Sequence, residues 1–358
     1  MTTVALIASA DALILDDLLR LAAAADVEVE VARDPDMVRA AWSGPQLVLV
    51  GHDLAGPVAE REPPRRAGVV VVAMDEDDES VYRAAVGLGA QHVVTLPDAE
   101  AWLVDAFAVA AEPPGPRAVQ ICVVGGRGGA GASVLATMLG LSAARRGHAA
   151  LLVDGDPYGG GLDLVLGQEA ADGARWPEFT GRRGRLSAAA LQESLPRLGE
   201  LSVLSWDRGP TEPIPGTAMR SVLDAASRAF ALVVVDLPRY LDEAAAEALA
   251  TGTLTLLVVP AEVRAAVAAD RVATALRRHA SDVRVVVARP APGGLTPEAV
   301  AQALGLPLAG TIDRDRRLAI ALEHGDLPDL RRRGRISGLC DRLLADFGQT
   351  DPRRGDVA

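Results

Sequence analysis

The 358-residue sequence contains no lysine, so all 36 residues counted as lysine or arginine are arginines. This absence excludes any mechanism that needs a lysine nucleophile or a lysine that clamps phosphate. A basic side chain at a functional site must therefore be arginine, whose planar guanidinium is not equivalent to an ammonium group.

Cysteine is scarce as well: the sequence has only Cys122 and Cys340, and they are isolated from each other. They can form neither a disulfide framework nor a Cys-x-x-Cys metal site, and the five histidines lack the mutual spacing of a metal site. We therefore expect no zinc, no haem and no iron–sulfur cluster, and we expect a reducing compartment.

No segment of the sequence is typical of a signal peptide or a membrane span. The chain opens MTTVALIASADALILDD, which lacks a basic start and is interrupted by Asp11. No uninterrupted apolar run approaches the roughly 20 residues of a transmembrane helix. The expected location is cytoplasmic, and a peripheral place at the inner face of the membrane, at a pole or at the septum stays open.

The acidic surplus is confined to the first third of the chain. Residues 1–110 contain 19 acidic residues and 7 arginines, which accounts for the whole formal net charge of -12, and the remainder holds 29 of each kind. An acidic domain repels the phosphates of nucleic acids. We therefore expect no direct nucleic-acid binding through the N-terminal part.

Short β-branched runs alternate with helical patterns through the first hundred residues, which is typical of βα units in a parallel sheet. The predicted strands are Val4–Ala8, Val27–Val31, Leu47–Val50, Val69–Ala73 and His92–Thr95. The predicted helices are Asp11–Ala25, Asp34–Trp42, Ser80–Leu88 and Ala99–Ala111, and a further crossover over 56–68 is left open. This layout resembles the CheY-like receiver domain of response regulators, a three-layer α/β/α fold.

The receiver pattern is degenerate at its functional positions. A receiver has acids at the ends of its first and third strands, a hydroxyl after the fourth and a lysine after the fifth. Here Gly51 stands at the acceptor position, Ala73 replaces the hydroxyl and Leu96 replaces the lysine. Asp53 is either a shifted acceptor or, as is usual for an isolated loop aspartate, a solvated turn residue. The departures favour a pseudo-receiver, kept for contacts rather than for phosphorylation.

A proline-rich segment separates the two halves of the chain. Residues 112–117, Glu-Pro-Pro-Gly-Pro-Arg, cannot continue a helix and are predicted to form a short stiff linker. A second βα series follows, with predicted strands at Ala118–Val124, Ala149–Val153, Leu201–Leu204, Leu232–Val235, Thr253–Val259 and Arg284–Ala288. We therefore expect a receiver-like domain over 1–111, the linker, a second α/β domain over 118–348 and a disordered tail over 349–358.

A glycine-rich segment, residues 125–133, follows the strand that ends at Val124 and precedes a helical pattern over Val134–Arg146. Glycine permits backbone conformations in which successive N–H groups point to one side, and the following helix adds its positive N-terminal end. A strand, a glycine-rich turn and a helix in this order predict a phosphate-binding loop, although such a turn can also serve tight packing alone.

Two later segments place acids at the ends of predicted strands. Asp154-Gly-Asp156-Pro follows one strand, and the next runs into Asp236-Leu-Pro238, which is a Walker B pattern. With the loop, these segments resemble the MinD/ParA superfamily of deviant Walker P-loop proteins (SIMIBI class), and residues 154–167 and 304–315 resemble its CpaE/TadZ-like, septum site-determining branch. The resemblance covers essentially the whole chain and implies a P-loop NTPase domain with a mostly parallel sheet.

The family's loop, Lys-Gly-Gly-x-Gly-Lys-Ser/Thr, aligns with residues 127–133. Arg127 thereby replaces the signature lysine, which reaches across a dimer, and Ala132 replaces the lysine that bridges the β- and γ-phosphates. The resemblance implies that nucleotide is bound by Gly126, Arg127, Gly128, Gly129, Ala130, Gly131, Ala132, Ser133 and Val134. It further implies that Mg²⁺ is held by Ser133, Asp154, Asp156 and Asp236, with Asp156 as the catalytic residue.

The missing lysines bear on activity and ligand. Phosphoryl transfer depends on positioning and on preorganised cations, so we expect little or no ATPase activity, while binding of ATP or ADP with Mg²⁺ can survive. An empty, relic loop is the alternative. The family commonly places asparagine after the strand that here ends Ala288-Arg289, so the identity of the base stays open.

The C-terminal segment has one apolar helical stripe after the basic run 330–335. The stripe consists of Ile336, Leu339, Cys340, Leu343, Leu344 and Phe347. MinD proteins hold the membrane with a basic amphipathic C-terminal helix, whereas CpaE-like chains end in a helix packed on the core. Asp341 and Asp346 on the polar face favour core packing over peripheral membrane contact.

The resemblance implies an atypical positioning or scaffold protein, acting in septum site determination or in localising a Tad-type pilus or secretion apparatus. One alternative is a slow ATPase that cycles between a monomer and a nucleotide-sandwiched dimer, with Arg127 acting in trans. Another is a signalling adaptor that works through the receiver-like domain. The expected partners are proteins of the division or secretion apparatus and a second copy of the chain.

Overall fold

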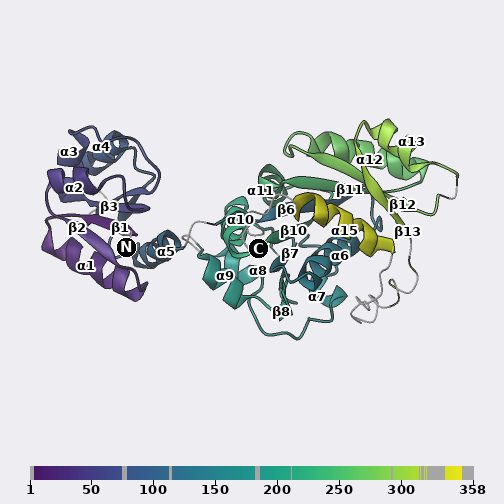
Figure 1. The fold of residues 1–358 in the computed structure, drawn as a ribbon, viewed down its shortest axis with the longest axis horizontal. Helices are drawn as coiled ribbons and strands as arrows, with labels where there is room; N and C mark the ends of the chain where they lie inside the picture. The colour runs from purple at the N-terminus through teal and green to yellow at the C-terminus, as the bar shows by residue number, and fades with distance from the viewer. Residues whose placement is uncertain are drawn as a thin grey trace, which may run out of the picture. The chain divides into compact units, whose positions relative to one another are not determined.

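The computed structural model describes residues 4–74, 79–112, 115–181, 186–210, 212–291, 293–313, 315, 318, 320 and 335–348. The chain divides into two compact units, and the boundary falls between residues 114 and 115. Each unit contains one sheet (Figure 1). The predicted tail over 349–358 and the arginine-rich runs 182–185 and 330–334 lie outside the described residues.

The first unit has a five-stranded parallel sheet in the order β2-β1-β3-β4-β5. Its strands are β1 (Ala5–Ala8), β2 (Val29–Ala32), β3 (Leu47–Gly51), β4 (Val69–Ala73) and β5 (His92–Thr95). The central strands β1, β3 and β4 are buried throughout and almost entirely aliphatic, as expected where helices cover both faces of a sheet. The edge strands β2 and β5 are only partly buried.

Helices α1 (Ala12–Ala24) and α5 (Glu100–Ala111) cover one face of this sheet, and α2 (Pro35–Ala41), α3 (His52–Ala59) and α4 (Glu79–Leu88) cover the other. Aspartates start two of them: the Asp11 carboxylate accepts hydrogen bonds from the first turn of α1, and Asp34 does the same for α2. The strand order and the layers confirm the predicted receiver-like fold.

The second unit has an eight-stranded sheet in the order β13-β12-β11-β6-β10-β7-β9-β8, parallel except for the β8–β9 hairpin. The strands are β6 (Val119–Gly125), β7 (Ala150–Asp154), β8 (Arg197–Leu198), β9 (Leu201–Leu204), β10 (Leu232–Leu237), β11 (Leu254–Pro260), β12 (Val283–Arg289) and β13 (Leu308–Asp313). This arrangement confirms the predicted mostly parallel P-loop fold.

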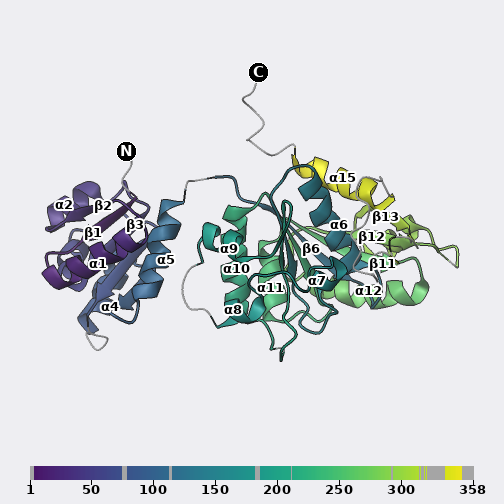
Figure 2. The same ribbon diagram turned by 90° about the horizontal axis from the view of Figure 1, so that it is seen from below.

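Helices cover both faces of this sheet as well (Figure 2). They are α6 (Ala132–Arg145), α7 (Leu162–Val165), α8 (Trp176–Thr180), α9 (Ala188–Ser194), α10 (Gly216–Ala229), α11 (Glu243–Thr251), α12 (Val263–Leu276), α13 (Pro297–Leu304) and α15 (Arg335–Gly348). Helix α6 lies on one face and α10 to α13 on the other, because the β6–β7 crossover runs along the sheet in the opposite direction to the crossovers that lead to β10, β11, β12 and β13. Helix α15 packs on the same face as α6.

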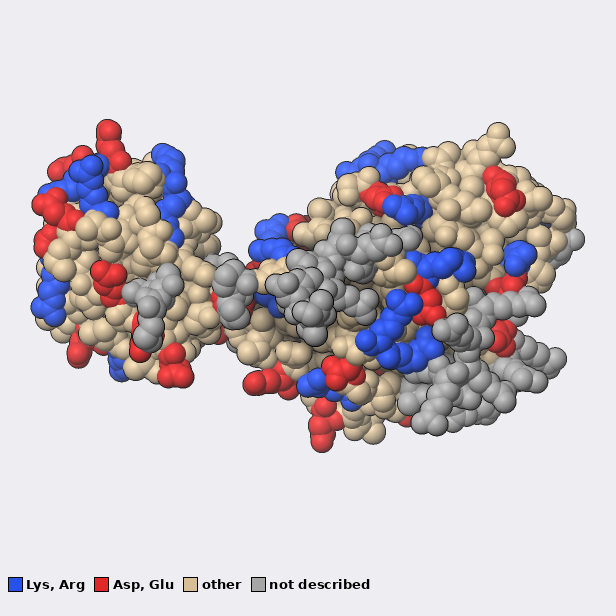
Figure 3. Space-filling model, in the orientation of Figure 1, with Lys and Arg blue, Asp and Glu red and all other residues tan. Residues whose placement is uncertain are grey.

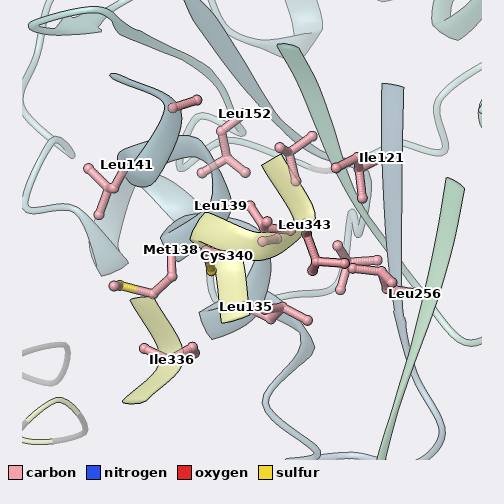
Figure 4. Packing of buried hydrophobic residues seen from close by; sticks show 14 of the residues in the cluster. Ile121, Leu135, Met138, Leu139, Leu141, Leu152, Leu256, Ile336, Cys340 and Leu343 are labelled. Atoms are coloured by element: carbon pink, nitrogen blue, oxygen red, sulfur yellow. The ribbon is translucent and has the colours of Figure 1, made fainter. Parts of the chain in front are cut away.

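The C-terminal helix α15 packs on α6 and β13. Figure 4 shows its contact with α6. Four of its stripe residues are at most 7% exposed and belong to the core: Ile336, Leu339, Cys340 and Leu343. A Cβ on Gly310 of β13 would lie 2.5 Å from Leu339 Cδ1, so Leu339 packs directly against the backbone of β13. Core packing, favoured from the sequence, is what the structure has; the side chain of Phe347 lies outside its described part.

While α15 stays packed, these four side chains cannot reach a bilayer. Its polar side is tied down too, because Arg146 forms an ion pair of 3.1 Å with Asp341. Within the described ranges, no helix has the length and apolar character needed to cross a membrane.

Strands β8 and β13 and helices α7 to α13 were not predicted from the sequence, and the region of α3 was left open. Helix α3 begins directly after β3 and includes Gly56 and Pro57, which are loop signals; burial of its apolar side on the sheet outweighs their low helix propensity. Strand β13 contains Gly310 and only a short apolar stretch, and it forms through pairing with β12 rather than through strong β-propensity.

Candidate functional site

The predicted phosphate loop, residues 126–131, lies between the carboxyl end of β6 and the start of α6. From β6 the chain passes through α6 to β7, and from β10 it passes through α11 to β11, on the opposite side of β6. The connections therefore diverge at this point of the sheet. Ligands of open α/β sheets bind in the crevice at such a point.

Glycine is required at two positions of the loop. Gly129 (φ 68°) and Gly131 (φ 97°) lie in the left-handed region, and Gly131 is the N-cap of α6, where no side chain caps the helix. A Cβ on Gly129 would meet nothing within 4 Å, so the loop is open there, whereas a Cβ on Gly126 would lie 2.8 Å from Cβ of Ala269 in α12. An uncapped helix start with a loop packed behind it fits a phosphate group.

Ser133 and Asp236 meet beside the loop. Strand β10 places Asp236 in register with Val123 of β6 and with Asp154 of β7. Burial raises the pKa of Asp236 to about 7; a hydrogen bond from the Ser133 hydroxyl opposes the rise, and the charges of Asp154 and Asp156 add to it. A hydroxyl and a carboxylate side by side are oxygen ligands that suit Mg²⁺.

Asp154 is committed to hydrogen bonds within the protein. It is 2% exposed, and its Oδ2 accepts from the N–H of Leu162 and from the Ser205 hydroxyl, each at 2.9 Å. Its Oδ1 accepts from the N–H of Asp156 at 3.3 Å. Burial raises the pKa of Asp154 to about 6 against these hydrogen bonds. Asp154 therefore holds both ends of the turn between β7 and α7.

Asp156 lies in that turn and is half-buried. Its Oδ1 accepts from the N–H of Tyr158 at 3.0 Å. The structure thus brings Asp154, Asp156 and Asp236 to neighbouring strand ends, with Ser133 at the start of α6. The described part of the chain nevertheless contains no group of three or more acidic, histidine or cysteine side chains arranged to hold a metal. Ser133 and Asp236 fit an ion best, and Asp154 fits least because both of its oxygens are engaged.

Arg127 is paired within its own chain. Its Nη2 donates to both oxygens of Glu262, at 2.9 and 3.1 Å, and Glu262 is the N-cap residue of α12. The Nε of Arg127 is buried and has no partner. The guanidinium is therefore directed to α12, and its charge is neutralised there.

Two residues beside the loop, Glu262 and Arg239, were not predicted from the sequence. A Cβ on Gly128 would lie 3.9 Å from Nη2 of Arg239, which follows the Walker B strand β10. Ala132, the first residue of α6, contributes no charge. Arg239 had a signal in the sequence, since it lies three residues after Asp236 in a chain without lysine; Glu262 lies 135 residues from Arg127 and had none.

In the receiver-like unit, side chains of the unit itself occupy the place where a phosphoacceptor aspartate would lie, at the ends of β1 and β3. Asp53 lies in the first turn of α3, and its carboxylate accepts from the Ser9 hydroxyl at 2.9 Å and from the N–H groups of Ala10 and Asp11 at 2.7 and 3.1 Å. A Cβ on Gly51 would lie 2.4 Å from Oδ1 of Asp53. The prediction of a solvated turn residue is wrong for Asp53, which locks the end of β1 to the start of α3.

Two family models match the chain, one for each unit. Residues 8–118 match the Rv3660c-like, CheY-like N-terminal domain. Residues 118–280 match the family described as cellulose biosynthesis protein BcsQ.

Among the relatives, the uncharacterized protein Rv3660c of Mycobacterium tuberculosis is 40% identical over 333 residues, which cover 92% of this chain and 93% of the relative. A chain of Nephroselmis olivacea that carries the name septum site-determining protein MinD is 27% identical over 222 residues, 60% of this chain and 81% of that protein.

Solved structures share the fold of the second unit. The MinC:MinD cell division protein complex of Aquifex aeolicus has a TM-score of 0.54 at 23% identity, covering 66% of this chain and 98% of that one. The septum site-determining protein MinD of Pyrococcus horikoshii, complexed with Mg-ADP, has a TM-score of 0.50 at 18% identity, covering 64% and 98%. With the two family models and the relative that matches along nearly the whole length, these findings show that the chain belongs to the MinD/ParA superfamily, and its CheY-like N-terminal domain agrees with the CpaE-like branch.

Proposed function

We propose that the protein is an atypical MinD/ParA-type positioning or scaffold protein that binds ATP or ADP with Mg²⁺ and hydrolyses ATP little or not at all. One observation carries the proposal: the loop keeps its glycine conformations and its Ser133–Asp236 contact, while position 132 holds alanine. Backbone N–H groups bind phosphate without a lysine, but phosphoryl transfer needs preorganised cations.

The residues divide the work of binding. Bound Mg²⁺ supplies positive charge to the phosphates, and Ser133 and Asp236 are the residues that would hold it. Asp154 keeps the turn in place through Leu162 and Ser205. Asp156 accepts a hydrogen bond through Oδ1, from the N–H of Tyr158, and is half-buried. In this proposal its carboxylate interacts with the ion or with the waters around it, which is the role predicted for it.

A slow ATPase that cycles through a dimer is the second candidate function. It requires Arg127 to reach a second copy of the chain. The Arg127–Glu262 pair disfavours this function, because both hydrogen bonds to Glu262 must break before the guanidinium can act in trans. Weak or absent hydrolysis is therefore the proposal that the pair supports.

The N-terminal unit serves contacts rather than phosphorylation in this proposal. The corner that an acceptor aspartate would occupy is filled by the Ser9 and Asp53 side chains, and Leu96 at the lysine position is 2% exposed. A pseudo-receiver of this kind supplies a binding surface for proteins of the division or secretion apparatus. The signalling-adaptor alternative is thereby included in the proposal, because the same N-terminal unit would bind the partner proteins.

The names of the relatives favour septum site determination over localisation of a Tad-type apparatus. A fluorescent fusion of the full chain, expressed in a mycobacterium that lacks its own 40% identical relative, tests this role. We expect foci at the septum or at a pole. Uniform fluorescence throughout the cytoplasm would contradict a positioning role.

Two glycine substitutions, one at each end of α6, test whether nucleotide binding is part of the function. Gly131→Ala places a side chain at φ 97° in the loop, and Gly147→Ala places one at φ 76° just past the other end of α6. Both substitutions strain the backbone, but only the first deforms the cradle. We expect Gly131→Ala to weaken Mg-ATP binding in calorimetry and Gly147→Ala to leave it unchanged; equal losses would show that general instability is responsible.

A further inference from the structure

Few positively charged side chains near the loop are available to bind a phosphate group. Position 132 is alanine, and the guanidinium of Arg127 is neutralised by Glu262 at 2.9 Å. Three carboxylates at the neighbouring strand ends, Asp154, Asp156 and Asp236, add negative charge. Backbone N–H groups carry partial charge alone. A nucleotide whose phosphates carry several negative charges therefore needs a cation from elsewhere in the chain.

Arg239 is the arginine that the fold brings to the loop. Asp236 and Leu237 end the buried strand β10, and Pro238 restricts the backbone just before Arg239. The side chain then extends toward Gly128, where Nη2 lies 3.9 Å from the position of a Cβ. Gly128 is exposed and so is Arg239. The guanidinium therefore lies beside the loop on its exposed side, next to Gly128.

The guanidinium of Arg239 is also uncommitted. Among the residues that the structure describes, no hydrogen bond or ion pair holds it, in contrast to Arg127 and to Arg208, which pairs with Asp163 at 3.0 Å. An unpaired arginine keeps its full charge and its planar donors for an anion.

We infer that Arg239 replaces the lost lysines as the cation that contacts the phosphates of a bound nucleoside di- or triphosphate. The inference rests on the proposed nucleotide-binding function and adds to it the residue that supplies the charge. A guanidinium suits this position because it binds two phosphate oxygens at once and can reach the loop from a neighbouring strand end. Arg239 thus binds from the segment that follows β10, whereas the lysines of the family lie within the loop itself.

Calorimetric titration of the full chain with Mg-ATP and Mg-ADP tests the inference with three variants. Arg239→Ala should lower the affinity roughly tenfold to a hundredfold, the factor that corresponds to one hydrogen bond to a charged group. Arg239→Lys keeps the positive charge but loses the paired donors of the planar guanidinium. Its affinity should therefore lie between those of wild type and Arg239→Ala. Arg271→Ala, which removes another exposed arginine from the middle of α12, is the matched control and should bind like wild type.

Salt dependence supplies a second readout. The affinity of wild type should fall with ionic strength more steeply than that of Arg239→Ala, because one charge contact with phosphate has been removed. If wild type binds nucleotide and Arg239→Ala binds equally well, the inference is wrong and the proposed function stands. If wild type takes up neither nucleotide, the proposed function fails and the inference fails with it.

Discussion

At the scale of single residues, Ala132 is the change in the loop that is most directly reversible. It is the first residue of α6, directly after the loop, and is half-buried. Lysine is a good helix former, and Ala132→Lys should not disturb the helix start. We expect Ala132→Lys to raise the affinity for Mg-ATP roughly tenfold to a hundredfold, since a charge-assisted hydrogen bond contributes about 1.5 to 3 kcal/mol.

Calorimetry on wild type, Ala132→Lys and Ala132→Met measures this effect. Methionine has a similar length and no charge, so its affinity should stay close to that of wild type. No gain for the lysine variant would indicate that the loop does not hold nucleotide, and a scaffold without nucleotide would then be the better description.

Asp236 gives the metal-free protein a pH dependence of definite sign. Burial raises its pKa to about 7, above the value of about 3.9 for an unfolded aspartate, so the folded state binds more protons between roughly pH 4 and 7. The free energy of unfolding should therefore fall as the pH rises through this window. Buried Asp154, with a pKa of about 6, acts in the same direction.

Urea unfolding in the presence of EDTA, at pH 5.5 and pH 8, measures this dependence. Asp236→Asn cannot ionise, so the variant should lose less stability than wild type between the two pH values. Equal losses in wild type and variant would contradict a raised pKa at Asp236. The comparison also removes the contribution of the acidic surface, which the two proteins share.

At the scale of elements, the junction of β1, β3 and α3 determines whether the N-terminal unit can be phosphorylated. The Asp53 carboxylate accepts three hydrogen bonds there, and the acceptor position itself is Gly51. We expect no label on the protein after incubation with acetyl phosphate. Label that maps to Asp53 by mass spectrometry and disappears in Asp53→Asn would show that this unit is a working receiver.

Helix α15 should stabilise the second unit through its apolar face. Leu339 is fully buried against α6 and Gly310, so Leu339→Ala should cost roughly 2 to 5 kcal/mol of unfolding free energy. Arg342, exposed on the same helix, is the control, and Arg342→Ala should change stability by no more than about 0.5 kcal/mol. Chemical denaturation measures both. Equal stability of wild type and Leu339→Ala would mean that α15 leaves the core readily and is free for a membrane.

The fold was largely predictable because its strands are short aliphatic runs with turn residues between them. The predicted strand bounds agree with those of β3, β4 and β6 to within a residue or two. The glycine-rich loop followed by helix α6 is also visible in the sequence. Helix α3 was not, because Gly56 and Pro57 mask a helix that forms through burial. Contacts between residues far apart in the sequence were not predictable from it: Ser9 and Asp53 are 44 residues apart, and Arg127 and Glu262 are 135 residues apart.

At the scale of the whole molecule, charge distinguishes the two units. Residues 1–110 carry the formal surplus of -12, and on the face of the first unit shown in Figure 3 acidic side chains and arginines are interspersed rather than gathered into a basic patch. Such a surface does not attract nucleic acid. Protein partners are therefore the expected ligands of this unit, and nucleotide is the expected ligand of the other.

The central claim is that the second unit holds a nucleotide and does not hydrolyse it, and ³¹P nuclear magnetic resonance tests both parts in one experiment. Wild-type protein is mixed with slightly less than one equivalent of Mg-ATP and followed for several hours. We predict phosphate resonances displaced or broadened relative to free Mg-ATP, with no growth of ADP or inorganic phosphate, because Ala132 supplies no charge to the transferred group. Resonances at the positions of free Mg-ATP, or steady release of phosphate that is lost in Asp156→Ala, would contradict the account.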